Sequence, residues 1–312
     1  MLETKIQEFE VNDEFDQYRI DKFLSIIYEG QSRTFFQKLI KDGQVTVNDQ
    51  TITKNSFPVT AGDIVTVQIP AVQSVDIIAE NIPLDILYED SDVLIVNKPK
   101  NMVVHPSAGH YTGTLVNAIM YHCENSLSGI NGVVRPGIVH RIDKDTTGSL
   151  IVCKNDQSHM DIAEQIKVHS VNRIYHGIVI GNLKDQEGQI DNYLSRHPQN
   201  RKKMAVCSPN QGKHAITHYK VLKSFKNYSY VEFKLETGRT HQIRVHMSSI
   251  GHPLLGDTIY GPEKQPFKGL QGQTLHAKTI GFIHPTSKEY VEFEAPLPEY
   301  FKELLEKLER MS

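Results

Sequence analysis

The sequence has no tryptophan, only three cysteines and no apolar run near the ~20 residues that a membrane-spanning helix requires. Cys123, Cys153 and Cys207 are widely spaced, which predicts neither a disulfide framework nor a paired-cysteine metal site. The first residues lack a basic flank followed by an apolar core, so we expect no signal peptide. These absences exclude disulfide-rich secreted domains and membrane spans, and they favour a cytoplasmic protein with free thiols.

The composition is that of a globular protein, with 39% hydrophobic and 23% charged residues among 312. The net charge of −3 gives no general attraction for a nucleic acid, but the charges are segregated. Residues 1–17 hold one lysine against six carboxylates, whereas a later stretch is basic: Arg196, Arg201, Lys202, Lys203, Lys213, Lys220 and Lys223. A local positive face suits a phosphate backbone, although a solvated surface loop explains the same run.

Residues 18–70 have the pattern of a small helical and stranded module. Apolar residues at helical spacing predict two helices, the second bounded by Ser32 as N-cap and Gly43 after its end. Alternation at 45–48 and 64–69 predicts strands. We therefore divide the chain into an acidic segment (1–17), this module (18–70), a linker (71–83) and a larger domain (84–312).

The module resembles the S4 RNA-binding domain through "SRTFFQKLIKDGQVTVND", which begins at Ser32. In that family the second helix presents cations to RNA phosphates. The resemblance implies this role for Arg33, Lys38 and Lys41. The solvent face of an amphipathic helix explains each of these cations equally well.

The larger domain is expected to be dominated by strands. A hairpin is predicted at 86–99, and further strands at 149–154, 173–180, 215–223, 228–236 and 289–295. Helices are predicted at 114–122, 157–168 and 241–250. The tight connection between 215–223 and 228–236 disfavours a parallel doubly wound sheet. The fold class is therefore α+β, with a mixed, mainly antiparallel sheet.

Two polar clusters stand out in this domain. The first, "HRIDKDTTG" (140–148), combines an imidazole, a guanidinium and two carboxylates directly before an apolar run. A plain turn with Gly148 at positive φ explains it as well as a reactive loop does. The second, "GRTHQIRVH" (238–246), predicts a helix capped by Thr240, whose start would favour anions. His241 and His246 are five apart, which does not suit a helical metal pair, so no metal is expected.

Together, these clusters resemble the RluA/RluD family of pseudouridine synthases. "GHPLLGDTIYG" (251–261), "VNKPKNMVVHPS" (96–107) and "VNRIYHGIVIG" (171–181) are similar to further blocks of that family. The resemblance covers nearly the whole chain, and the S4 module ahead of it is typical of RluD-type large-subunit rRNA enzymes or their RluC-type relatives. One departure is Asn101, where the family block usually has glycine.

The resemblance implies an isomerase that converts uridine in RNA to pseudouridine without a cofactor. Asp143 would be the carboxylate that acts near the ribose, as nucleophile or as base, while Arg244 keeps it charged. Tyr175 would stack on the uracil and assist loss of the C5 proton. Arg141 would fill the gap left by the flipped base, and Lys98, Arg173 and Arg239 would contact RNA. Asp145 is assigned to the loop.

Two alternatives compete with this interpretation. The first is a non-catalytic S4-type RNA-binding protein, and the second is a glycoside-type hydrolase with paired carboxylates. Asp143 and Asp145 are poorly spaced to flank a sugar, and a hydrolase leaves the second cluster unexplained. The expected partner is RNA, most naturally large-subunit ribosomal RNA. No membrane partner is expected, and the protein is expected to be a monomer. The target uridine is not encoded in any motif.

Overall fold

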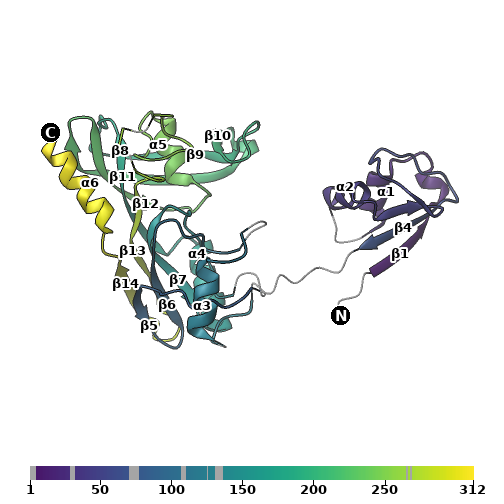
Figure 1. Cartoon of the computed structure of the whole chain (residues 1–312), viewed down its shortest axis with the longest axis horizontal. Helices are drawn as coiled ribbons and strands as arrows, with labels where there is room; N and C mark the ends of the chain where they lie inside the picture. Colours follow the sequence, from purple (N-terminus) through teal and green to yellow (C-terminus); the bar gives the residue numbers. More distant parts are fainter. Residues whose placement is uncertain are drawn as a thin grey trace. The chain divides into compact units, whose positions relative to one another are not determined.

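The chain divides into two compact units, Met1–Val75 and Asp76–Ser312 (Figure 1). The computed structural model describes residues 5–28, 32–69, 77–106, 110–124, 126–130, 136–264, 266–267 and 269–312. Among these residues, no helix combines the length and the apolar character needed to cross a bilayer.

The first unit packs two helices against a small sheet. In chain order it consists of β1 (Lys5–Glu10), the short 3-10 helix η1 (Asp13–Phe15), α1 (Ile20–Ile27), α2 (Arg33–Lys41), β2 (Val45–Val47), β3 (Gln50–Thr51) and β4 (Ile64–Ile69). The sheet has the order β1-β4-β2-β3. The Ser32 side chain accepts a hydrogen bond from the Phe35 amide at 3.3 Å, which confirms the predicted N-cap of α2. Gly43 follows α2 with φ +70°, as a residue after the helix end requires.

The acidic segment contributes to this unit. β1 pairs antiparallel with β4, Phe9 lying opposite Val65. Val11 and Phe15 are buried in the same core as the α1 and α2 side chains. Residues 5–17, which we predicted as a separate segment, thus form one edge of the first unit.

The second unit contains a ten-stranded sheet, which holds the candidate site. Its elements are β5 (Ile86–Glu89), β6 (Val93–Lys98), α3 (Leu115–Cys123), β7 (Thr147–Cys153), α4 (Asp156–Lys167), β8 (Asn172–Ile180), β9 (Glu187–Arg196), β10 (Met204–Cys207), η2 (Pro209–Gln211), β11 (Lys213–Phe225), β12 (Tyr228–Leu235), α5 (Gln242–Ser249), β13 (Leu275–Ile283), β14 (Tyr290–Glu294) and α6 (Glu299–Arg310).

The sheet order is β10-β9-β11-β12-β8-β13-β7-β6-β5, with β14 paired to β13. Among the described strands, β13 and β7 are parallel and the other pairs are antiparallel. This confirms the expected α+β class and the mixed, mainly antiparallel sheet. β13 lies between β8 and β7 in the middle of the sheet. A strand from near the end of the chain thus joins two halves of the sheet that come earlier in the sequence.

β7 is buried along its whole length because both of its faces are covered. Leu150 and Val152 share a core with α3 on one face. Ile151 and Cys153 share a second core with α4 on the other. This double burial explains the continuous apolar run after "HRIDKDTTG" and makes β7 a rigid support for the loop that precedes it.

The predicted linker (71–83) lies partly outside the described residues, which omit 70–76. The remainder packs on the second unit: Ile77 is buried in its core. Asn117 of α3 donates its side-chain amide to the Ile78 carbonyl at 2.8 Å and accepts the Glu80 amide on its own carbonyl at 2.9 Å. The second unit therefore includes residues before the predicted boundary at 84.

Candidate active site

The loop before β7 is fixed by hydrogen bonds and by one close backbone approach. The Thr146 amide donates to the Asp143 carbonyl at 3.1 Å, and the Thr146 hydroxyl accepts from Gln273 at 3.0 Å. Gly148 has φ +108°, and a Cβ there would collide with the Ala277 carbonyl of β13. The turn thus lies at residues 143–146, with Lys144 and Asp145 at its centre, whereas Thr147 and Gly148 already belong to β7. This turn, rather than one at 146–148, sets the position of Asp143.

Lys98, at the end of β6, binds the same loop through its side chain. Its side chain is 1% exposed, and its ammonium donates to the carbonyls of Pro99 (2.8 Å), Met102 (2.8 Å) and Lys144 (3.0 Å). Three bonds use all three N–H groups. Burial lowers the pKa of Lys98 to about 7, against the opposing charges of Asp145 and Asp143. This geometry corrects the prediction that Lys98 contacts RNA, because the ammonium is committed to the loop.

Asp143 forms an ion pair with Arg244 of α5, 101 positions along the chain. Arg244 Nη1 lies 2.8 Å from Asp143 Oδ2. The same guanidinium donates twice to Asp257, from Nε at 2.7 Å and from Nη2 at 3.0 Å. The side chains of Asp143, Arg244 and Asp257 are 26%, 5% and 0% exposed. Arg244 is therefore clamped by a buried carboxylate and presents one edge to a carboxylate that solvent and a ligand can reach.

The charges of this triad stabilise one another. Burial by itself would lower the pKa of Arg244, but hydrogen bonds and charges from Asp257 and Asp143 raise it above its usual value. Burial would raise the pKa of Asp257, but Arg244 and the amides of Tyr260 and Ile259 lower it. Both groups are thus held in their charged forms.

His241 lies on the other side of Asp143. Its Nε2 is 3.8 Å from Asp143 Oδ1, and its Nδ1 is 2.8 Å from the Tyr260 hydroxyl. That hydroxyl accepts the Met204 amide at 2.7 Å, so its single proton points to Nδ1. Burial lowers the pKa of His241, which keeps the ring neutral at pH 7 with its proton on Nε2, facing Asp143.

The start of α5 differs from the prediction. We expected Thr240 to cap the helix, whereas His241 occupies the cap position with φ 57° and no side-chain cap. The Gln242 side-chain oxygen instead accepts the Arg239 amide at 2.9 Å, and Thr240 accepts from Arg141 at 3.2 Å. The left-handed turn aims His241 at Asp143, which an ordinary helix start would not do.

Tyr175 of β8 forms one wall of the site. It is 8% exposed, and burial together with the charge of Asp143 raises the pKa of its phenol, which stays protonated at neutral pH. A cavity of about 60 Å³ lies between these groups; it is lined by Arg141, Ile142, Asp143, Thr146, Tyr175, Leu235, Arg239, His241, Gln242, Ile243, Arg244 and Leu275. The structure thus brings together Asp143, Tyr175 and Arg244 from three distant parts of the sequence.

The three arginines that we predicted to contact RNA lie around this cavity and differ in exposure and in hydrogen bonding. Arg141 is exposed at the rim. Arg239 donates from Nε to the His214 carbonyl at 2.8 Å. Arg173 is 6% exposed and donates to the Glu236 carbonyl at 3.1 Å. Arg141 is therefore accessible from solvent, whereas Arg173 is reached only through a cavity.

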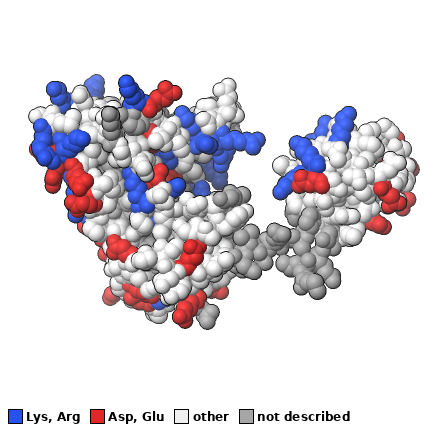
Figure 2. Space-filling view, in the orientation of Figure 1, with Lys and Arg blue, Asp and Glu red and all other residues white. Residues whose placement is uncertain are grey.

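The first unit carries the other predicted cations. Lys38 and Lys41 are exposed on α2, and Figure 2 shows Lys and Arg gathered on the side of this unit formed by α1 and α2. Arg33 donates to Asp21, a carboxylate that is 0% exposed, and Arg19 donates to the same group. Burial would raise the pKa of Asp21, but hydrogen bonds from Arg19, Gln37 and Arg33 lower it to about 2. Asp21 thus holds two half-exposed guanidinium groups on one face.

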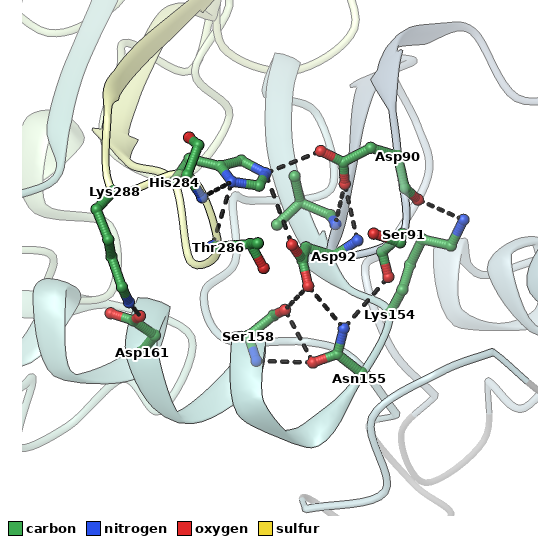
Figure 3. A network of polar contacts seen from close by, with 12 residues as sticks. Asp90, Ser91, Asp92, Lys154, Asn155, Ser158, Asp161, His284, Thr286 and Lys288 are labelled. Atoms are coloured by element: carbon green, nitrogen blue, oxygen red, sulfur yellow. Dashed lines mark hydrogen bonds and ion pairs between the residues drawn. The ribbon is translucent and has the colours of Figure 1, made fainter.

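The described residues contain one group with the ligand types and spacing for a metal ion: Asp90, Asp92 and His284. Figure 3 shows these side chains already hydrogen-bonded within the protein. Asp90 accepts His284 Nε2 at 2.8 Å, and Asp92 accepts Asn155 and Ser158, each at 2.9 Å. This network ties the β5–β6 turn to the start of α4 and to the β13–β14 turn, which accounts for it without a metal.

Three residues around Asp143 were not identified from sequence: Asp257, His241 and Tyr260. In the first unit, the same is true of Asp21, which binds Arg33. Asp257 and Tyr260 lie in "GHPLLGDTIYG", a block that we used only as a family marker. An aspartate inside so apolar a block was a usable signal, because a buried carboxylate needs a partner. His241 was considered only as a metal ligand, and nothing in the sequence placed it beside Asp143.

Comparisons with known proteins match both parts of the chain. A family model described as RNA pseudouridylate synthase matches residues 92–249, and one described as the S4 domain matches residues 19–65. The chain is 51% identical to an uncharacterized RNA pseudouridine synthase, YlyB, of Bacillus subtilis, over 96% of this chain and 97% of that protein. It is 47% identical to ribosomal large subunit pseudouridine synthase D of Zymomonas mobilis, over 93% of each. The solved structure of human RNA pseudouridylate synthase domain containing 4 aligns with a TM-score of 0.56 at 25% identity, over 72% of this chain and 92% of that one.

Proposed function

This chain belongs to the RNA pseudouridylate synthase family and acts as an isomerase on uridines in RNA, and we propose that its substrate is large-subunit ribosomal RNA, with Asp143 as the catalytic carboxylate. Isomerisation breaks the bond from N1 to C1′, forms a bond from C5 to C1′, removes the C5 proton and returns a proton to N1. The reaction gains and loses no atoms overall and involves no redox change, so we propose that it needs no cofactor.

The observation that carries the assignment of Asp143 is its ion pair with Arg244 at the cavity. The guanidinium stabilises a carboxylate in a partly buried place, where an isolated charge would be costly. The second carboxyl of the loop, Asp145, has no such partner among the described residues. A charged oxygen beside a narrow cavity suits attack on, or proton removal from, a ribose held there.

The other side chains have roles that follow from where they lie. We propose that Tyr175 stacks on the extracted uracil and that its hydroxyl, still protonated, assists proton transfer from C5. Arg141, exposed at the rim, would replace the uridine in its stack, because a guanidinium can both stack and bind phosphate. Extraction costs a few kcal/mol and is easiest from a loop.

RNA binding is shared between the units in this proposal. In the first unit, Arg33, Lys38 and Lys41 would contact RNA phosphates. In the second unit, Arg239 would contact RNA beside the cavity. Exposed cations of the second unit, among them Arg196, Arg201, Lys202 and Lys213, would extend the contact. We propose a monomer that acts in the cytoplasm, which agrees with three unpaired cysteines. The domain limit at 70 stays a prediction.

The test is to map pseudouridines in ribosomal RNA from cells with and without the gene. Loss of one or more sites in the deletion strain is expected. Restoration by the wild-type gene and failure of Asp143→Asn to restore would establish the activity and the role of the carboxylate. Asp145→Asn is the matched control, because it makes the same chemical change two residues away and should restore the sites.

Three results would contradict the proposal. Unchanged ribosomal RNA in the deletion strain would exclude this substrate. Normal modification by Asp143→Asn would exclude the assigned carboxylate. If wild-type protein binds the RNA but leaves every uridine unmodified, the chain is an S4-type binding protein instead.

A further inference from the structure

A second cavity, of about 550 Å³, adjoins the one that holds Asp143. The two share Arg141, Tyr175, Leu235 and Arg239 as lining residues. The remaining lining residues of the larger cavity are His105, Ile138, Val139, His140, Ile166, Lys167, His169, Arg173 and Gly238. No aspartate or glutamate is among them. A cavity of this volume accommodates a nucleotide-sized group, and its lining favours an anion.

The guanidinium of Arg173 is the decisive feature of this cavity. Arg173 precedes Tyr175 by two positions on β8, so both side chains face the same side of the sheet. It is 6% exposed and pairs with no carboxylate among the described residues. Nη2 donates to the Glu236 carbonyl, whereas Nε is buried with no hydrogen-bond partner in the part of the chain that the structure describes.

A buried cation without a counter-charge is costly, and proteins normally pair such groups. Burial lowers the pKa of Arg173, the phenol of Tyr175 would raise it, and the charge of Arg239 lowers it further, so no carboxylate offsets the cost of burial among the described residues. His140 also lines this cavity, but its ring does not bind Arg173. Its Nε2 instead accepts a hydrogen bond from the Ile151 amide at 2.9 Å. In the part of the chain that the structure describes, Arg173 therefore has no negatively charged partner, and its charge is available to an anion.

Gly238 makes room for this guanidinium. A Cβ at that position would lie 2.5 Å from Arg173 Nη1, so any other residue would push the guanidinium aside. Gly238 begins the second polar cluster, which gives this glycine a function that the sequence alone did not explain. It lets the backbone before α5 approach the side chain closely.

The charged residues at the rim of the cavity do not neutralise Arg173. Lys167 pairs with Glu164 at 2.8 Å, but both side chains are more than half exposed, and such pairs are weak enough to exchange for a phosphate. Glu236 is exposed and is engaged by His218 at 2.6 Å. The carboxylates near the rim are thus both exposed and paired, and they leave the buried Arg173 uncompensated.

We propose that this cavity binds the backbone phosphate adjacent to the target uridine, with Arg173 as the buried partner of its charge. The inference rests on the proposed function and extends it to a second nucleotide. Because the two cavities adjoin and share four lining residues, the nucleotide next to a uridine in the smaller cavity would lie in the larger one. A uracil carbonyl would also accept a hydrogen bond from Nε, but it would leave the buried positive charge unpaired.

The test uses an RNA fragment that contains a mapped target uridine labelled with tritium at C5. Three versions are prepared: the natural RNA, and two in which the phosphate on the 5′ or the 3′ side of the uridine is replaced by an uncharged methylphosphonate. Tritium release gives kcat/KM for wild type, Arg173→Gln and, as a matched control on α6, the exposed Arg310→Gln.

One of the two replacements should lower kcat/KM of the wild type about 10- to 100-fold, as expected for loss of a hydrogen bond between charged groups. Arg173→Gln should lose a similar factor on natural RNA and less than about twofold more on that methylphosphonate. Arg310→Gln should behave like wild type on all three RNAs. This pattern identifies Arg173 and one specific phosphate as a coupled pair.

Gly238→Ala keeps the charge of Arg173 but displaces it, so it should reproduce the loss even if Arg173→Gln folds poorly. Thermal unfolding of each variant identifies simple destabilisation. Fluorescence anisotropy of the same RNAs in an Asp143→Asn background measures the phosphate contact without chemistry, and the same methylphosphonate should weaken binding only when Arg173 is present.

Equal methylphosphonate penalties in wild type and Arg173→Gln, in rates and in anisotropy, would overturn the proposal. An equal loss by Arg173→Gln on all three RNAs, with the penalty retained, would assign Arg173 to the base or to the fold and would also overturn it. Absence of tritium release from every RNA would refute the proposed function instead, while the anisotropy comparison would still decide whether the phosphate is bound.

Discussion

Replacing Asp257 by asparagine tests whether the clamp on Arg244 is needed for the site. Asp257 Oδ1 accepts the amides of Ile259 and Tyr260 at 2.9 and 3.0 Å and Arg244 Nη2 at 3.0 Å, while Oδ2 accepts Arg244 Nε at 2.7 Å. The oxygen of an asparagine would remain with the two backbone amides. Its NH₂ group would then face Nε, and a donor would oppose a donor where a 2.7 Å bond now exists.

The loss of stability follows from the burial of both partners. Removing one partner of a buried ion pair costs about 3–5 kcal/mol, and the oxygen that asparagine retains places this variant near the lower limit. For a unit of this size, 3 kcal/mol corresponds to a fall of roughly 6–12 °C in the unfolding temperature. Urea denaturation of the second unit would give the free energy directly.

The catalytic effect is expected on kcat more than on KM. Arg244 is 5% exposed and contacts Asp143 at 2.8 Å, so a guanidinium released by Asp257 moves the charge that holds the proposed catalytic carboxylate. A misplacement of about 1 Å costs roughly 100-fold in rate. Tritium release from C5-labelled RNA, measured at saturating RNA below the unfolding temperature, gives this number.

The control is Asp161→Asn, which breaks the 2.6 Å pair with Lys288, a residue whose side chain is 64% exposed. Exposed pairs contribute at most about 1 kcal/mol, and neither Asp161 nor Lys288 lines the cavity at Asp143. Unchanged kcat in Asp257→Asn, together with the expected loss of stability, would refute the claim that Asp257 positions Arg244 for chemistry.

Further predictions concern RNA binding and pH. Arg33→Gln should lower RNA affinity and reduce the slope of log affinity against log salt by about 1, as loss of one phosphate contact does; an unchanged slope would remove Arg33 from the interface. Asp21→Asn should weaken RNA binding while all cations are retained, because Arg33 loses its buried partner. Burial lowers the pKa of His246 from 6.5 to about 4, against the charge of Asp191. The unfolded chain binds the proton first, so stability is complete above pH 6.5 and falls toward pH 4, by up to about 1.4 kcal/mol per pH unit. His246→Gln should flatten this dependence in urea titrations.

Local patterns identified those elements whose cause is local. The helices α1 to α5 and the strands β5 to β8, β11, β12 and β14 lie close to the predicted ranges, because apolar spacing and capping act within a few residues. Ser32 and Gly148 behave as their residue types suggest. The strands β1, β9, β10 and β13 and the helix α6 were not predicted. β9, for example, is polar along much of its length and is a strand because β10 and β11 pair with it.

The candidate site divides in the same way. Motifs pointed to Asp143, Tyr175 and Arg244 through resemblance, and their placement in one cavity agrees with that expectation. The same motifs also suggested Lys98 as an RNA contact, which its three bonds to carbonyls contradict. A motif specifies residue types and spacing, but it does not say whether a cation points to solvent or into the protein.

The sequence by itself determined the order of the two units and the class of the fold, since these depend on periodicity and on motifs that lie along the chain. Through the family resemblance it also indicated the candidate carboxylate and guanidinium of the site. Only the tertiary structure decided which groups hold those residues. Asp257 lies beside Arg244, His241 beside Asp143 and Gly238 against Arg173, and each pair joins segments that are separated along the chain. Pairs of this kind arise from burial, because a charge removed from water needs a partner, and the nearest partner in space is set by the sheet rather than by the chain.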